Sequence, residues 1–155
     1  MNIRLICIGQ KMPSWVEEGY QEFAKRINGD IRLKLLELPM AKRLKNQSVE
    51  QFKRREAESI MAALHPQEYP VVLDVLGKSI NTEDLAEKLN QWKMLGQDVA
   101  IIIGGPDGLA TEVLALAREK LSLSKLTLPH PLVRVIVAEQ VYRAWSLSKG
   151  HPYHK

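Results

Sequence analysis

Hydrophobic and polar positions follow two patterns along the chain, and each pattern predicts one kind of element. An apolar run at residues 3–8 and a continuously apolar run at residues 99–103 predict buried strands, and the second run belongs in the middle of a sheet because it is also rich in β-branched residues. Residues 31–38 and 71–75 predict two more strands, and Gly77 is expected to end the second of these.

The segments between these strands show helical periodicity. Ser14 with Glu17, and Ser48 with Gln51, have the spacing of a helix-starting capping box, while Gly96 is placed to end the third helix. The periodicity predicts buried stripes made of Val16, Tyr20, Phe23 and Ile27, of Ala57, Ile60, Met61 and Leu64, and of Leu85, Leu89 and Trp92.

Strands that alternate with helices of this length imply βαβ crossovers. We therefore predict an α/β fold, a mostly parallel sheet flanked by helices on both faces, and one domain that covers residues 1–155. Ligands of such folds bind beyond the carboxyl ends of the strands, so the loops after Val75, Ile103 and Leu128 are where chemistry is expected.

Composition excludes several classes of protein. Hydrophobic residues make up 45% and charged residues 26% of the 155 residues, as in ordinary globular domains. The longest apolar runs are five residues, far below the ~20 that a membrane span needs, so we expect a cytoplasmic protein without membrane contact. The single cysteine, Cys7, lies in an apolar run and is predicted to be a buried strand residue.

The net charge of +4 is concentrated in one stretch. Residues 42–55 contain six basic residues and one acid, a local charge of +5. The pattern allows either a solvated loop and helix face or a surface that binds the phosphates of a nucleic acid. The basic residues are Lys42, Arg43, Lys45, Lys53, Arg54 and Arg55.

A glycine-rich loop, IGGPDG, occupies residues 103–108. Its glycines permit positive φ angles and close approach of a ligand to the backbone. It matches neither of the two common glycine-rich phosphate motifs, so it is either a binding loop of another kind or a tight turn.

The last helix is expected at residues 132–147, after His130 between two prolines. Its apolar residues lie almost all round, which predicts that it packs both on its own sheet and on a second copy of the chain, with Val137 and Val141 on the outward face. Glu139 and Arg143 have the spacing of a helical ion pair. We therefore infer a homodimer.

The carboxyl end, GHPYHK, is rich in groups that move protons or stack on bases. His151, Tyr153 and His154 lie on a short segment that its glycine and proline are expected to keep from being helical. No cysteine or carboxylate lies near enough in the sequence to complete a tetrahedral set, so no metal is expected. The alternative to a chemical role is a frayed terminus.

Several of these segments together resemble one family. In order and across the full length, the chain is similar to the ribosomal large subunit methyltransferase H family of the SPOUT superfamily, in the segments ICIGQKMPSWVEEGYQEFAKR, LDVLGK, IIIGGPDG, LSLSKLTLPHPLVRVIVAEQVYRAWS and HPYHK. The resemblance implies an S-adenosyl-L-methionine-dependent enzyme that methylates N3 of a pseudouridine in the helix 69 stem-loop of 23S rRNA. It also implies a homodimer and a deep trefoil knot at the carboxyl end, a rare exception to the rule against knotted chains.

The family's functional positions fall on residues of this sequence that match its motifs. The resemblance assigns proton handling to Tyr153 and His154, with Arg143 as an electrostatic partner, and it makes the basic stretch a candidate surface for 23S rRNA. The implied cofactor contacts are Leu73, Gly104, Leu123, Ser124, Lys125, Leu126, Thr127 and Leu128.

Two other functions remain open at this point. A SPOUT methyltransferase that acts on tRNA would share the knot, and a non-catalytic RNA-binding or ribosome-assembly protein would share the basic stretch. Methyl transfer needs no metal, so none is expected in any of these cases.

Overall fold

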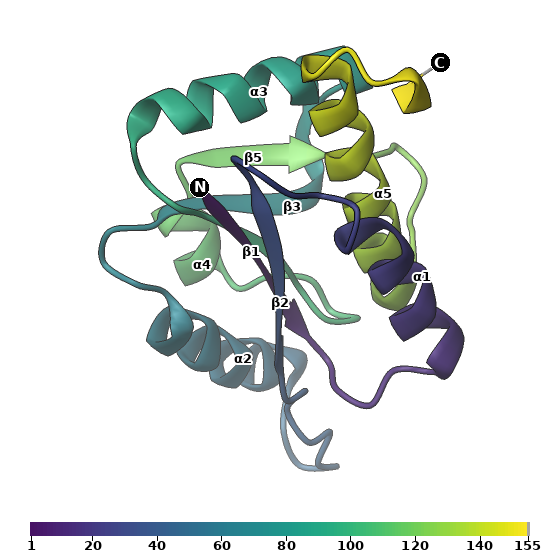
Figure 1. The fold of residues 1–155 in the computed structure, drawn as a ribbon. Helices are drawn as coiled ribbons and strands as arrows, with labels where there is room; N and C mark the ends of the chain where they lie inside the picture. Colours follow the sequence, from purple (N-terminus) through teal and green to yellow (C-terminus); the bar gives the residue numbers. More distant parts are fainter. Residues whose placement is uncertain (155) are drawn as a thin grey trace.

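A computed structural model describes residues 1–154, and for His154 the backbone alone. The chain alternates strands with helices and ends in a single 3₁₀ turn, as Figure 1 shows. The elements are β1 (Asn2–Ile8), α1 (Ser14–Ala24), β2 (Arg32–Leu38), α2 (Val49–Ala63), β3 (Tyr69–Ser79), α3 (Thr82–Leu95), β4 (Val99–Ile103), α4 (Thr111–Leu116), β5 (Glu119–Ser122), α5 (His130–Ser148) and η1 (Pro152–His154).

The five strands form one parallel sheet in the order β2-β1-β4-β3-β5. Strand β4 lies in the middle, and all five of its residues are buried. This confirms the predicted α/β class and the predicted central position of residues 99–103. The trefoil knot that the family resemblance implies stays a prediction.

Helices cover both faces of the sheet, as predicted. Side chains of β1 alternate between two cores, so that Leu5 and Cys7 face α1, α3 and α5, while Ile6 and Ile8 face α2 and α4. Cys7 is completely buried, as its apolar run predicts, and burial raises the pKa of its thiol to about 12.

Helix α5 is the longest element and lies between α1 and α3 over one face of the sheet (Figure 1). Because α1, α3 and the sheet all pack against it, the sequence of α5 is apolar almost all round. Val137 and Val141 are 3% and 1% exposed in the chain's own core, so placing them on an outward face was wrong. Among the described residues, no helix is both long enough and apolar enough to cross a membrane.

The predicted helix caps are confirmed in part. Ser48 and Gln51 form the predicted capping box, and Gly96 ends α3 in the left-handed conformation. The capping box predicted at Ser14 is wrong, because Pro13 takes the N-cap position and Ser14 is already the first helical residue. Met61, which was predicted to point inward, is 48% exposed.

Gly77 does not end the third strand. Strand β3 continues through it to Ser79, and its register against β5 shifts between Leu73 and Lys78. A Cβ atom at Gly77 would lie 2.8 Å from the backbone of Leu121 in β5. The glycine therefore permits a close approach of two strands, and the irregularity leaves residues 74–77 out of the pairing with β5.

Candidate functional site

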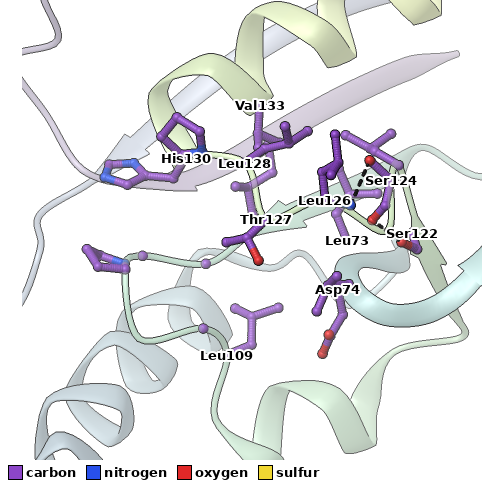
Figure 2. Close-up of a pocket in the computed structure, with 18 of the residues that line it drawn as sticks. Leu73, Asp74, Leu109, Ser122, Ser124, Leu126, Thr127, Leu128, His130 and Val133 are labelled. Atoms are coloured by element: carbon purple, nitrogen blue, oxygen red, sulfur yellow. Dashed lines mark hydrogen bonds between the residues drawn. The ribbon is translucent and has the colours of Figure 1, made fainter.

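A cavity of about 740 Å³ opens at the carboxyl edge of the sheet. Three loops that are far apart in sequence line it, namely residues 73–75 of β3, residues 103–109 after β4, and residues 122–124 and 126–130 after β5, together with Val133 of α5. Figure 2 shows the last of these loops across the cavity from Leu109 and Asp74. These are the three regions in which the topology predicted a ligand site.

The glycine-rich loop forms one wall through a tight internal turn. Gly105 and Gly108 pair as an isolated bridge, and the Gly108 N–H donates to the Gly105 carbonyl at 3.0 Å. Gly108 has a φ of 81°, and a Cβ atom at Gly104 would lie 3.0 Å from both the Gly108 carbonyl carbon and the Leu109 side chain. Glycine is therefore required here for the shape of the loop.

The loop after β5 is braced by its own hydroxyls. The Ser122 hydroxyl donates to the Ser124 carbonyl at 2.9 Å, and the Ser124 hydroxyl accepts from the Leu126 N–H at 2.9 Å (Figure 2). Leu126 is 73% exposed at the rim. Strand β5, which precedes this loop, ends at Ser122, so residues 123–129 are loop.

Most of the predicted cofactor residues meet at this cavity. Only Lys125, which is exposed, does not line it. The predicted residues that do line it are Leu73, Gly104, Leu123, Ser124, Leu126, Thr127 and Leu128.

His130 lies at the mouth of α5 and lines the same cavity. Burial, and after it the nearby Arg134 guanidinium, lower the pKa of His130, so its imidazole is neutral at pH 7. Arg134 is 1% exposed, donates to Glu37 Oε2 at 2.7 Å and reaches the Gly9 carbonyl at 3.4 Å. Sequence reasoning missed this buried pair, because its members are 97 positions apart and no local pattern joins them.

The predicted proton-handling residues gather at the other end of α5. Glu139 Oε1 accepts from Arg143 Nε at 2.8 Å and from the Tyr153 hydroxyl at 3.2 Å, and the Arg143 guanidinium lies 4.9 Å from the centre of the Tyr153 ring. Tyr153 also packs on Tyr142, with ring centres 4.5 Å apart. The side chain of His154 lies outside the described residues.

The pKa of Tyr153 is raised, first by burial and then by the Glu139 carboxylate. The phenol therefore keeps its proton at neutral pH and serves as a hydrogen-bond donor. Because Tyr153 is half-buried and bonded to α5, this part of the tail is docked and not frayed.

Arg143 and Tyr153 do not line the cavity. Thirteen residues separate His130 from Arg143 on α5, which corresponds to about 20 Å at the helical rise of 1.5 Å per residue. One copy of the chain therefore holds the cavity and the tail cluster (Glu139, Arg143 and Tyr153) at opposite ends of one rigid helix.

A second hollow, of about 540 Å³, follows the outer side of α5 between these two ends. Ile136, Gln140 and Leu147 line it from α5, and the start of α3 forms its other side. Leu123 lines both this hollow and the cavity, so the two are adjacent. The surface of α5 that remains open for a partner is this face, and not the face of Val137 and Val141.

The basic stretch divides into free and engaged side chains. Lys42, Lys45 and Arg54 are exposed, and Lys53 is half-buried. The Arg43 and Arg55 guanidinium groups lie 4.7 and 5.8 Å from the centre of the Phe52 ring, so both pack against the protein. Within residues 1–154 no group of three His, Cys, Asp or Glu side chains could hold a metal ion.

Comparison with known proteins identifies the class. A model of the family described as "Predicted SPOUT methyltransferase" matches residues 1–154. The chain belongs to the SPOUT methyltransferase family and is an enzyme of that class, and its reaction requires a methyl donor.

Relatives at high identity share one name. The chain is 51% identical to the ribosomal RNA large subunit methyltransferase H of Hahella chejuensis, over 100% of this chain and 99% of the relative. It is 54% identical to the protein of that name from Hydrogenovibrio crunogenus, with the same coverage.

A solved structure shares the fold. The probable methylase family protein from Haemophilus influenzae Rd KW20 aligns with a TM-score of 0.57 and 16% identity, over 99% of this chain and 70% of that protein. This likeness supports the overall fold of the chain.

Proposed function

We propose that this enzyme transfers a methyl group from S-adenosyl-L-methionine to N3 of a pseudouridine in the helix 69 stem-loop of 23S rRNA. The observation that carries the proposal is that relatives named ribosomal RNA large subunit methyltransferase H match the chain from end to end at about half identity. A ribosomal substrate places the activity in the cytoplasm, and we take residues 1–155 as one catalytic domain.

The chemistry of the cavity fits such a donor. Its volume of about 740 Å³ lies within the range of small-molecule sites. Leu73, Leu109 and Val133 offer apolar walls for a nucleoside, while the Asp74 carboxylate adds negative charge that suits a cationic sulfonium. S-adenosyl-L-methionine would supply a methyl group already activated by its sulfur, so no metal is needed.

The chain's own residues would then bind the donor, orient the base and remove the N3 proton. The glycine-rich loop and residues 123–128 hold the donor by backbone contacts and exclude water, and N3 of the base has to lose its proton as it accepts the methyl group. Tyr153 can orient the base through its hydroxyl or by stacking, and Arg143 can stabilise developing negative charge. His154 is the candidate that accepts the proton.

The proposed mechanism needs two copies of the chain. Since the cavity and the tail cluster lie about 20 Å apart along α5, a methyl donor in the cavity does not reach the tail of its own copy. A twofold homodimer that packs the outer hollows of two α5 helices against each other in antiparallel fashion would bring each tail to the cavity of the other copy.

RNA is proposed to bind the exposed basic residues of the stretch 42–55. Lys42, Lys45, Lys53 and Arg54 can reach phosphates, and A-form RNA is recognised mainly through its backbone and shape. Arg43 and Arg55 were included in the sequence-based prediction and are engaged within the chain.

Labelled methyl transfer tests the proposal directly. The purified enzyme is incubated with methyl-labelled donor and, in separate reactions, with 70S ribosomes, large subunits, free 23S rRNA and tRNA, and the modified nucleotide is then mapped. We expect label at N3 of a pseudouridine in helix 69. Label in tRNA alone would replace the proposal by the tRNA alternative, and donor binding without transfer to any RNA would contradict it.

A further inference from the structure

One arginine of the basic stretch makes contacts that a phosphate-binding side chain does not need. Arg43 lies in the loop between β2 and α2, and its side chain is only 33% exposed. Its Nη1 donates to the Ala41 carbonyl at 2.8 Å and to Glu56 Oε2 at 3.2 Å. The face of its guanidinium covers the Phe52 ring. The group is thus held on several sides.

The same guanidinium reaches the glycine-rich loop. Arg43 Nη2 lies 2.8 Å from Asp107 Oδ2, an ion pair whose angles are not those of an aligned hydrogen bond. Asp107 lies between Gly105 and Gly108, inside the turn that lines the cavity. Arg43 therefore ties the basic loop to the wall of the proposed donor site.

A buried carboxylate fixes the arginine in this position. Glu56 is 3% exposed on α2, and besides Arg43 it accepts from the Ala41 N–H at 3.0 Å. Its other oxygen, Oε1, has no hydrogen-bond partner among the described residues and lies 3.3 Å from where a Cβ atom of Gly105 would be. A buried carboxylate is costly without a cation, so the arginine is required where it is.

We propose that Arg43 is a positioning residue of the methyl-donor site, which acts through Asp107 on residues 104–108, and not a contact to RNA phosphate. This inference rests on the proposed function only in taking the cavity as the donor site. Only arginine suits the role, because its planar fork reaches two carboxylates at once, whereas a lysine ammonium is a single point of charge.

The charge-conserving change Arg43→Lys separates the two roles. A phosphate contact would tolerate it, while a clamp between Glu56 and Asp107 would not. We expect the dissociation constant for S-adenosyl-L-methionine to rise by about five- to tenfold, a usual size for groups in direct contact. The matched exposed variant Lys45→Arg should leave donor affinity unchanged in calorimetry.

Hydrogen exchange supplies a readout that does not depend on the donor. In Arg43→Lys the amides of Gly105, Asp107 and Gly108 should exchange several-fold faster, while those of β4 stay protected, which excludes general unfolding. If the wild type binds no donor but the loop still exchanges faster in Arg43→Lys, the proposed function fails, while the positioning of residues 104–108 by Arg43 stands.

Two further variants complete the test. Asp107→Asn keeps the Arg43–Glu56 pair, so the variant should fold normally while its donor binding is weakened. When Asp107→Asn is combined with Arg43→Lys, their effects on donor affinity should not add. Arg43→Met should leave the salt dependence of RNA binding unchanged. The proposal would be overturned if Arg43→Lys had the donor affinity and the loop exchange of the wild type, and if Arg43→Met lowered the slope of log RNA affinity against log salt by about 0.7–0.9. Arg43 would then be a contact to RNA phosphate.

Discussion

The two ends of helix α5 differ in how much of a reaction one copy of the chain contains. At the amino end, three loops close around a cavity whose walls, hydroxyls and carboxylates all come from the same copy. At the carboxyl end, Arg143 and Tyr153 share the Glu139 carboxylate and lie outside this cavity, and Arg143 lines the hollow on the outer side of α5. Donor binding should thus be a property of one chain, and methyl transfer a property of two.

Removing the tail should have the largest effect of the changes considered, because it should abolish methyl transfer and leave donor binding unchanged. We expect deletion of residues 150–155 to lower methyl transfer by about 10²-fold or more, the usual contribution of proton handling in catalysis. Donor affinity should stay at the wild-type value, since none of the tail residues that the structure describes lines the cavity. Rates are measured with labelled donor and affinity by calorimetry.

Mixing two inactive variants tests whether the ends act across copies. After full exchange of subunits, tail-deleted chains mixed with Gly104→Val chains should recover about a quarter of the wild-type rate, because half of the dimers are mixed and each has one intact site. No recovery, with subunit exchange verified by mass, would show that the tail acts on its own copy.

A charge in the outer hollow should also separate donor binding from methyl transfer. Ile136→Asp places a carboxylate on the face of α5 where we expect the second copy. The variant should be monomeric in light scattering, inactive in methyl transfer and competent to bind donor. A wild-type protein that is itself monomeric at micromolar concentration would remove the basis for this expectation.

Gly104→Val should damage the opposite end. A side chain there meets the backbone of Gly108 at 3.0 Å and displaces the loop, so we expect donor affinity to fall at least about tenfold, or roughly 1.4 kcal/mol. The dimer mass should not change. Unaltered donor affinity in calorimetry would exclude this loop from the site.

The amino end of α5 could be predicted from the sequence, whereas at the carboxyl end only the Glu139–Arg143 ion pair could be predicted and the docking of Tyr153 on Glu139 could not. Parallel βαβ order brings the carboxyl ends of strands to one edge, so local patterns were sufficient to expect a site near Val75 and after Ile103. Gly77 was misread because a strand break and a close strand approach both select glycine. Val137 and Val141 were misplaced because periodicity does not reveal which neighbours cover a helix that is apolar on all sides.

Charge patterning had the same limitation in the basic stretch. Six basic residues predict a positive surface, but composition does not show that Arg43 turns toward Glu56 and Asp107 while Lys42 and Lys45 remain in solvent. Long-range partners such as the Arg134–Glu37 pair are set by the tertiary fold alone.

A change on the RNA surface should affect neither end of α5 directly. Replacing Lys42, Lys45 and Arg54 by alanine should weaken RNA binding and lower the slope of log affinity against log salt by about 2–3 units, at 0.7–0.9 per phosphate contact. Donor affinity is the internal control and should not change. Wild-type salt dependence in this triple variant would identify the stretch as a solvated face.

The smallest effect concerns the anchor of the carboxyl end. Asp30 accepts from Lys149 Nζ at 2.9 Å, from Lys93 Nζ at 3.0 Å and from Trp145 Nε1 at 3.3 Å. These bonds, that of Lys149 first, hold the pKa of Asp30 well below its usual range. A carboxyl with a lowered folded pKa contributes stability that is complete above its unfolded value, near 3.9, and is lost as the pH falls toward the folded value.

Asp30→Asn should therefore destabilise the protein at neutral pH and not at low pH. Because the carboxylate is 35% exposed, we expect a loss of no more than about 1 kcal/mol in denaturant unfolding at pH 7. The difference between the variant and the wild type should shrink as the pH falls below about 4. Donor affinity should stay constant throughout, since Asp30 lies at the far end of α5 from the cavity. A destabilisation that is the same at pH 7 and pH 3 would mean that Asp30 contributes through the geometry of its hydrogen bonds and not through its charge.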